Sequence, residues 1–206
     1  MKIETQNKLK KIKSGFRLLM DGVASRSMRD KGLDYKINWG VPLPSLKTLA
    51  TEYGKDYDLA VELWKENIRE CKILATMIMP PEEMKADMVN LWMSDITNQE
   101  IAETAAFYLL QYIENAKDFA FKWLASDKDA EQICGYQVLS RLFMKDEQLD
   151  VREINEFIDQ AKTALQSDNL AVRHAVTNSI SRFCSISDEH YKIAKSAFKA
   201  YDLNIL

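Results

Sequence analysis

Residues 170–181 read LAVRHAVTNSIS, and this stretch decides the fold. Its apolar side chains recur at steps of three and four, a pattern that continues to residue 183: Val172, Ala175, Val176, Ile180 and Phe183. Because an α-helix has ~3.6 residues per turn, this spacing places them on one helix face. The remaining polar face is then available to solvent or to a partner.

Three further stretches have the same character: NIRECKILATMI (67–78), QEIAETAAFYLL (99–110) and AEQICGYQVLSR (130–141). With Cys71, Thr104, Cys134 and Ala175 as anchors, the intervals are 33, 30 and 41 residues. Helical solenoids repeat on this scale, because one helix pair is too small to bury its apolar face alone. We therefore predict an all-α fold, an α-α superhelix of HEAT-like or ARM-like repeats, as a single domain over residues 1–206.

The whole chain favours helices, since it has only six Gly and four Pro and no stretch alternates apolar with polar residues. Asp56, Asp168 and Asp188 stand where N-caps are expected, and Thr97 with Glu100 has the spacing of a capping box. The predicted helices are 4–13, 15–30, 43–53, 57–66, 69–79, 82–94, 98–112, 116–125, 129–144, 150–166, 168–184 and 188–202.

Some residues inside these helices predict packing contacts. Gly135 costs a helix about 1 kcal/mol relative to Ala, so we expect it where two helices approach closely. Ala175 is expected at a similar contact. Trp64, Trp92 and Trp123 lie in apolar patterns and are expected in the core.

Composition indicates a globular protein, with 47% hydrophobic and 29% charged residues. No stretch approaches the ~20 apolar residues that span a membrane, and residues 1–16 have no apolar core of signal-peptide type. We expect a cytoplasmic protein. The cysteines and histidines (Cys71, Cys134, Cys184, His174 and His190) have no metal-ligand spacing, so we expect no metal site, no disulfide and no cofactor.

Charge is distributed unevenly along the chain. Residues 1–36 contain ten Lys and Arg against four Asp and Glu, a net charge of +6, whereas the whole chain carries −3. A basic arm on an acidic body favours a polyanionic partner. A solvated amphipathic first helix is the alternative.

The polar faces of the repeat helices are candidate binding surfaces. They carry Arg69 and Lys72 in the helix at 69–79, Gln99 with Glu103 one turn later in the helix at 98–112, and Arg173, His174, Thr177, Asn178, Ser181 and Arg182 in the last repeat. Stacked repeats align such faces into one concave surface. These residue types suit phosphate contacts, and a peptide groove is the alternative.

Residues 39–78 read WGVPLPSLKTLATEYGKDYDLAVELWKENIRECKILATMI. The Gly-Val-x-x-Pro beginning at Gly40, the LA-x-E-x-G-K-D turn from Leu49, the Leu63–Trp64 pair and the I-R-E-C-K-I-L-A stretch carry a resemblance. The segment resembles the start of the bacterial HEAT-like-repeat DNA alkylation-repair family, and the likeness extends over about residues 15–185. This resemblance implies a protein that holds duplex DNA in its concave face. Enzymes of the family remove N3- or N7-alkylated purines.

The resemblance also implies site residues. The family's Trp falls on Gln99 and its Asp on Glu103, while its Arg falls near Ile133 beside Gln132 and its last Trp near Asn178. Glu103 is thus the candidate catalytic carboxylate, which would stabilise a cationic sugar, and an ordinary solvated Glu is the alternative. Candidate DNA contacts are Arg69, Lys72, Gln99, Gln132, Arg173, Asn178 and Arg182.

Because the family's aromatic and Arg side chains are replaced, we expect a protein that binds duplex DNA, alkylated or not, and excises bases weakly or not at all. Two alternatives stay open at this point. The concave face could bind a protein partner without any chemistry, or Glu103 could serve a glycosylase with a rebuilt site.

Overall fold

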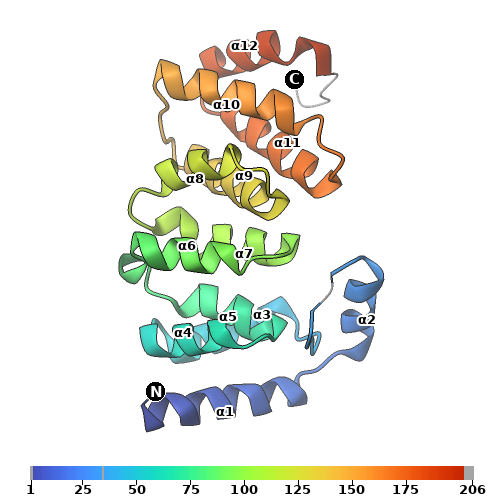
Figure 1. Cartoon of the computed structure of the whole chain (residues 1–206), viewed down its shortest axis with the longest axis vertical. Helices are drawn as coiled ribbons and strands as arrows, with labels where there is room; N and C mark the ends of the chain where they lie inside the picture. The colour runs from blue at the N-terminus through green and yellow to red at the C-terminus, as the bar shows by residue number, and fades with distance from the viewer. Residues whose placement is uncertain (1, 34, 202–206) are drawn as a thin grey trace. The chain divides into compact units, whose positions relative to one another are not determined.

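The computed structural model describes residues 2–33 and 35–201, and within them the chain is helical, without any β-strand (Figure 1). An isolated parallel bridge joins Ile37 to Ile68. The α-helices are α1 (Ile3–Leu18), α2 (Gly22–Asp30), α3 (Leu43–Tyr53), α4 (Tyr57–Lys65), α5 (Arg69–Ile78), α6 (Ala86–Ser94), α7 (Gln99–Tyr108), α8 (Ala116–Leu124), α9 (Asp129–Phe143), α10 (Val151–Ala164), α11 (Leu170–Cys184) and α12 (Asp188–Ala197). Short 3-10 helices lie at Pro81–Glu83, Leu110–Tyr112 and Lys199–Tyr201. The all-α prediction is confirmed.

The chain forms two compact units, Met1–Leu109 and Leu110–Leu206. In the first unit α5 is the central helix, because α3, α4 and α7 all pack against it, and α1 packs on α4. In the second unit α9 lies between α8 and α11, and α12 covers α11. That residues 1–206 make a single domain stays a prediction.

The observed helix starts correct several predicted caps. Asp56 caps α4 by accepting a hydrogen bond from Leu59 N at 3.0 Å, as predicted. The predicted caps Asp168 and Asp188 are each wrong by one residue, because Asn169 caps α11 and Ser187 caps α12. Such shifts arise because neighbouring Asp, Asn and Ser residues all cap well.

The predicted break between residues 13 and 15 is also wrong, since α1 continues through Ser14 and Gly15 to Leu18. Leu9, Ile12 and Phe16 are buried along one stripe, and this packing outweighs the ~1 kcal/mol cost of a helical Gly. The chain turns only at residues 19–21, where Asp21 caps α2 by accepting from the amides of residues 23 and 24.

Core packing follows the predictions. A Cβ added at Gly135 would lie 2.9 Å from the carbonyl oxygen of Ala120, so α8 and α9 approach each other closely. Ala175 is buried on α11. Trp64, Trp92 and Trp123 are buried too, and the first two stack with their ring centres 4.1 Å apart.

Candidate nucleic-acid interface

The first turns of α7 carry the two residues at the resembled catalytic position. Asn98 caps the helix through a hydrogen bond from Ile101 N at 3.1 Å. Gln99 and Glu103 are partly exposed one turn apart, and Gln99 Nε2 donates to Glu103 Oε1 at 2.8 Å. The predicted shared face of Gln99 and Glu103 is therefore confirmed. The Gln99 amide therefore holds the Glu103 carboxylate from the same helix. The resemblance places a Trp side chain at the position of Gln99.

Arg69 lies in a buried ionic cluster, so its predicted place on the exposed face is wrong. Its side chain is 4% exposed and donates from Nε and Nη2 to both oxygens of Glu100, at 2.8 and 2.6 Å. Nη1 lies 3.2 Å from Glu70 Oε1, and the Tyr35 hydroxyl donates to Glu100 Oε2 at 2.5 Å. Burial alone would lower the pKa of Arg69, but the carboxylates of Glu100 and Glu70 more than reverse this and raise it. Burial, reinforced by the charge of Glu100, raises the pKa of Tyr35.

The same cluster corrects the predicted capping box. Glu100 bonds to Arg69 and Tyr35, while Asn98, and not Thr97, caps α7. A bidentate bond to a buried guanidinium is stronger than a bond to an exposed backbone amide. Tertiary contact therefore decides the role of Glu100.

The cluster also holds residues 37–41, which lie between α2 and α3. Trp39 N and Val41 N each donate to the carboxylate of Glu70 at 3.2 Å. Arg69 donates from its backbone N to Ile37 O at 3.0 Å and from Nη1 to Val41 O at 3.2 Å. Arg69 and Glu70 thus position residues 37–41.

Lys72 is likewise less available than predicted. Its side chain is 16% exposed, lies 3.7 Å from Asp95 Oδ2, and places Nζ 4.2 Å from the centre of the Trp64 ring. Trp64 Nε1 donates to the same Asp95 oxygen at 3.1 Å. Burial lowers the pKa of Lys72, although Asp95 opposes this. The residue packs against the Trp64–Trp92 stack and offers little surface to a phosphate.

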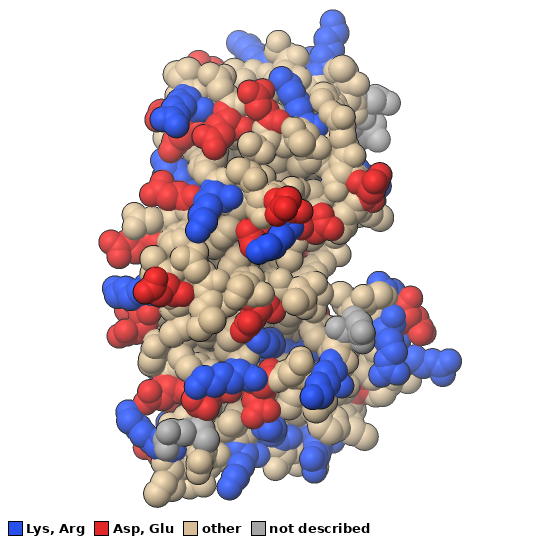
Figure 2. All heavy atoms as spheres, viewed as in Figure 1, with Lys and Arg blue, Asp and Glu red and all other residues tan. Residues whose placement is uncertain are grey.

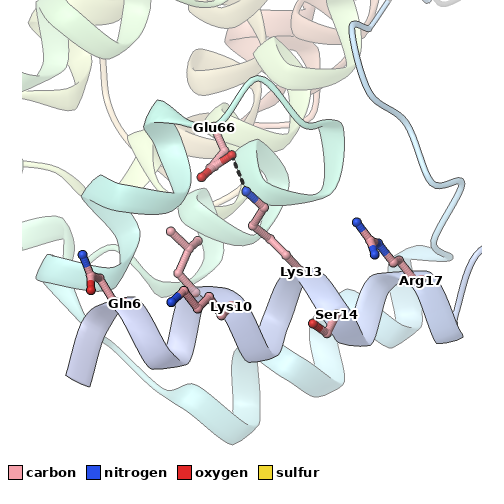
Figure 3. Close-up of a pocket in the computed structure, with 7 residues that line it drawn as sticks. Gln6, Lys10, Lys13, Ser14, Arg17 and Glu66 are labelled. Atoms are coloured by element: carbon pink, nitrogen blue, oxygen red, sulfur yellow. Dashed lines mark hydrogen bonds and ion pairs between the residues drawn. The ribbon is translucent and has the colours of Figure 1, made fainter. Parts of the chain in front are cut away.

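A groove of about 500 Å³ runs along α1, with Glu66 on its other side (Figure 3). It is lined by Gln6, Leu9, Lys10, Lys13, Ser14, Arg17 and Glu66. Lys13 Nζ lies 2.8 Å from Glu66 Oε2, whereas Lys10 and Arg17 are exposed and have no carboxylate within 4.0 Å among the described residues. Since α1 rises ~1.5 Å per residue, its cations form a row along the groove.

Further cations lie on and beside α2. Figure 2 shows Lys and Arg side chains gathered over α2 and along α1. Arg29, Lys31 and Lys36 are exposed, and in the described part of the chain none of them forms an ion pair. This N-terminal arm, residues 2–33, 35 and 36, is an exposed cationic surface that the repeat pattern missed. The charge count over residues 1–36 was the signal for it.

The other predicted contacts lie in the second unit. Gln132 Nε2 donates to Ser126 O at 2.6 Å, and Asn178 Nδ2 donates to Ser140 Oγ at 2.9 Å. Arg173 donates to the carbonyl oxygen of Ser167, and Arg182 is exposed. Ile133, at the expected Arg position, is buried. The amide of Gln132 thus bonds to the loop before α9, and the amide of Asn178 joins α11 to α9. The alignment of these residues with the α7 face stays a prediction.

Two kinds of feature are absent from the described residues. None of the helices there has the length and apolar character needed to cross a membrane. No group of three or more His, Cys, Asp or Glu side chains in residues 2–33 and 35–201 is arranged to hold a metal ion.

The profile of the DNA alkylation repair enzyme family matches residues 13–194, which is most of the chain. The chain belongs to this family. The resemblance noted for residues 39–78 is therefore confirmed.

Two relatives match over similar lengths. Uncharacterized protein Lin0241 of Listeria innocua is 24% identical over 166 residues, which are 77% of this chain and 70% of the relative. Uncharacterized protein Lmo0209 of Listeria monocytogenes is 22% identical over 167 residues, 79% of this chain and 71% of the relative.

A solved structure has the same fold. It is described as "a new family of proteins related to the HEAT-like repeat DNA glycosylases with affinity for branched DNA structures". The TM-score is 0.83 at 18% sequence identity, and the match covers 93% of this chain and 82% of the other. The predicted HEAT-like fold class is thereby confirmed.

Proposed function

We propose that this chain binds DNA through the phosphate backbone and does not excise alkylated bases. The observation that carries the proposal is the set of exposed cations on the N-terminal arm: Lys10, Arg17, Arg29, Lys31 and Lys36. None of these five has a carboxylate within 4.0 Å among the described residues. Membership of a DNA repair family supports DNA as the polyanion, as does the affinity for branched DNA ascribed to the related structure.

Binding of this kind is electrostatic. Lys and Arg neutralise phosphates and release condensed counterions, so affinity falls steeply with salt and depends little on base sequence. The row of cations along α1 suits contacts with successive phosphates of one DNA strand better than contacts with base edges. We expect dissociation constants on the order of 10⁻⁴–10⁻⁶ M for plain duplex near physiological salt.

The loss of excision rests on α7. Removing a cationic base requires a preorganised carboxylate beside the sugar, commonly worth about 2.7–4 kcal/mol. Glu103 has one methylene more than the expected Asp, and its carboxylate accepts a hydrogen bond from Gln99 at 2.8 Å. Gln99 offers no aromatic face to exclude water, and a misplacement of about 1 Å can cost ~10²-fold in rate.

The proposal is tested by measuring duplex binding over a series of salt concentrations. Five phosphate contacts would give a log–log slope of about −4.5, at ~0.9 for each phosphate. Absence of binding even at low salt would end the DNA proposal and favour the protein-scaffold alternative. Salt-independent binding would exclude the N-terminal arm as the contact surface.

We also propose a cytoplasmic location for this function. Cys71 and Cys134 are buried free thiols, Cys184 is a partly exposed one, and burial raises the pKa of Cys71 to about 12. Unpaired cysteines are typical of reducing compartments. Cell fractionation with an antibody to the chain tests the assignment, and recovery outside the cytoplasmic fraction would contradict it.

A further inference from the structure

The turn between α1 and α2 exposes an unusual set of apolar side chains. Leu18 is 88% exposed, Leu19 42%, Met20 61% and Val23 81%. These four residues, the α1–α2 corner, include three consecutive apolar residues facing solvent. Scattered exposed apolar residues need no explanation, but a consecutive exposed run indicates a contact surface.

The backbone at the base of this corner is fixed. Asp21 N donates to Trp39 O at 2.9 Å, and the Asp21 side chain caps α2. Gly40 adopts a positive φ of 70°, and a Cβ there would lie 2.1 Å from the carbonyl oxygen of Asp21. Only glycine permits this close approach. The corner is therefore held in place by the segment that Arg69 and Glu70 anchor, and its apolar side chains are displayed on a rigid turn.

Cations flank the corner on both helices. Arg17 precedes it on α1, is exposed, and lies over the Trp39 ring at 5.6 Å. Arg26 follows on α2, where its side chain is 83% exposed and its only ion pair in the described chain, with Asp30, spans 4.0 Å. A partner that fits has apolar faces with negative charges at their edges.

We propose that the α1–α2 corner packs against unstacked bases at an opened site in DNA, with Arg17 and Arg26 on the adjacent phosphates. Unstacked bases present flat apolar faces between phosphates, and proteins insert Leu, Met or Ile side chains at such steps. This inference rests on the proposed function. It adds that the chain distinguishes an opened site, with unstacked bases, from a fully paired duplex.

The geometry favours DNA over a lipid surface. Helices that bind membranes present a continuous apolar face along their length. Here the apolar stripe of α1, which includes Leu9, Ile12 and Phe16, is buried in the core. Along α1 and α2 the large exposed apolar side chains gather at the turn, apart from Ile3 at the start of α1, and this local cluster suits a local opening in a duplex.

The test compares two labelled duplexes of equal length, one fully paired and one with a two-nucleotide bulge containing 2-aminopurine, whose fluorescence rises on unstacking. The wild-type chain should bind the bulged duplex more tightly and raise its fluorescence. Leu18→Ser combined with Met20→Ser should reduce the preference about tenfold, equivalent to ~1.4 kcal/mol, and leave binding of the paired duplex unchanged. Met20→Trp should raise the preference, because aromatic rings stack well on bases.

Val151→Ser combined with Leu170→Ser is the matched control, because it removes two exposed apolar side chains, 77% and 57% exposed, from the other unit. An unchanged preference in the corner variant would overturn this inference and leave the proposed function standing. Failure of the wild type to bind either duplex would overturn both. Tighter binding to phosphatidylglycerol vesicles than to DNA would assign the corner to a lipid surface and overturn the inference. Self-association that the corner variant abolishes would assign the corner to a second copy and overturn it as well.

Discussion

Two cationic regions of the first unit differ in what surrounds their charges. On α5, Arg69 forms a bidentate pair with Glu100, and Lys72 lies against Trp64 and Asp95. On the N-terminal arm, residues such as Lys10 and Arg29 are exposed, without carboxylate partners among the described residues. The first region uses its cations to hold the fold, whereas half of the ten cations of the N-terminal arm have no ion pair among the described residues and stay available for a partner. The other half, such as Lys8 and Lys13, pair with carboxylates.

The difference shows why residue type and helical position do not identify a binding face. Arg69 and Lys72 occupy the polar side of a repeat helix, and that pattern predicted exposure. Their partners lie 31 and 23 residues away in sequence, where periodicity gives no information. The charge count over the N-terminal arm does not depend on knowing which carboxylate each cation contacts. It indicated the region where the structure exposes cations without ion pairs among the described residues.

The largest expected effect comes from Arg69→Met. Removing the guanidinium leaves Glu70 and Glu100 without a cation in a buried cluster, which should cost about 3–5 kcal/mol of unfolding free energy. Urea denaturation measures it. Arg29→Met, on the exposed arm, is the matched control and should stay within about 0.5 kcal/mol of wild type. Equal stability of the two variants would remove the distinction between the regions.

A smaller effect concerns binding. Reversing Lys10 and Arg29 together to Glu should lower the slope of log affinity against log salt by about 1.8, as two phosphate contacts are lost. Lys72→Met should leave that slope unchanged, because Lys72 is turned toward Trp64. Electrophoretic mobility shifts over a salt series give the slopes. A larger loss for Lys72→Met than for the arm variant would reverse the roles assigned to the two regions.

A still smaller effect is the pH dependence contributed by Lys72. Burial holds its pKa below the ordinary value of 10.5. Between the two pKa values the unfolded chain binds more protons, so stability should rise with pH in that window. Lys72→Met should remove this part of the rise, whereas Lys10→Met on the exposed arm should keep it. Denaturation at several pH values just below 10.5 tests this, and identical profiles for wild type and Lys72→Met would refute it.

The smallest expected effect is on base release. Wild type and Glu103→Gln should both release 7-methylguanine from methylated DNA at background level, because the Glu103 carboxylate lacks the aromatic wall and is held by Gln99. Chromatography of released bases measures this. Robust release by wild type that disappears in Glu103→Gln would make Glu103 catalytic.

Helix positions and core contacts were predictable from the sequence because they depend on local spacing. Buried Trp64 and Trp92 follow from the 3.6-residue period, and Gly135 marks a close approach because a helix tolerates Gly poorly without a packing reason. Caps such as Asp168 were wrong by a single residue, since adjacent polar residues compete for the same backbone amides.

The sequence by itself determined the repeat fold, the family and the basic character of the N-terminal arm. Each of these depends on patterns formed by residues close together in the chain. Only the tertiary structure decided which cations are neutralised, and it joined Tyr35, Arg69 and Glu100 from three separate segments. It also decided that the segment anchored by Arg69 holds the exposed apolar turn after Leu18. The reason is that the energy of a charge depends on its burial and its partners, and both are set by contacts between residues far apart in sequence.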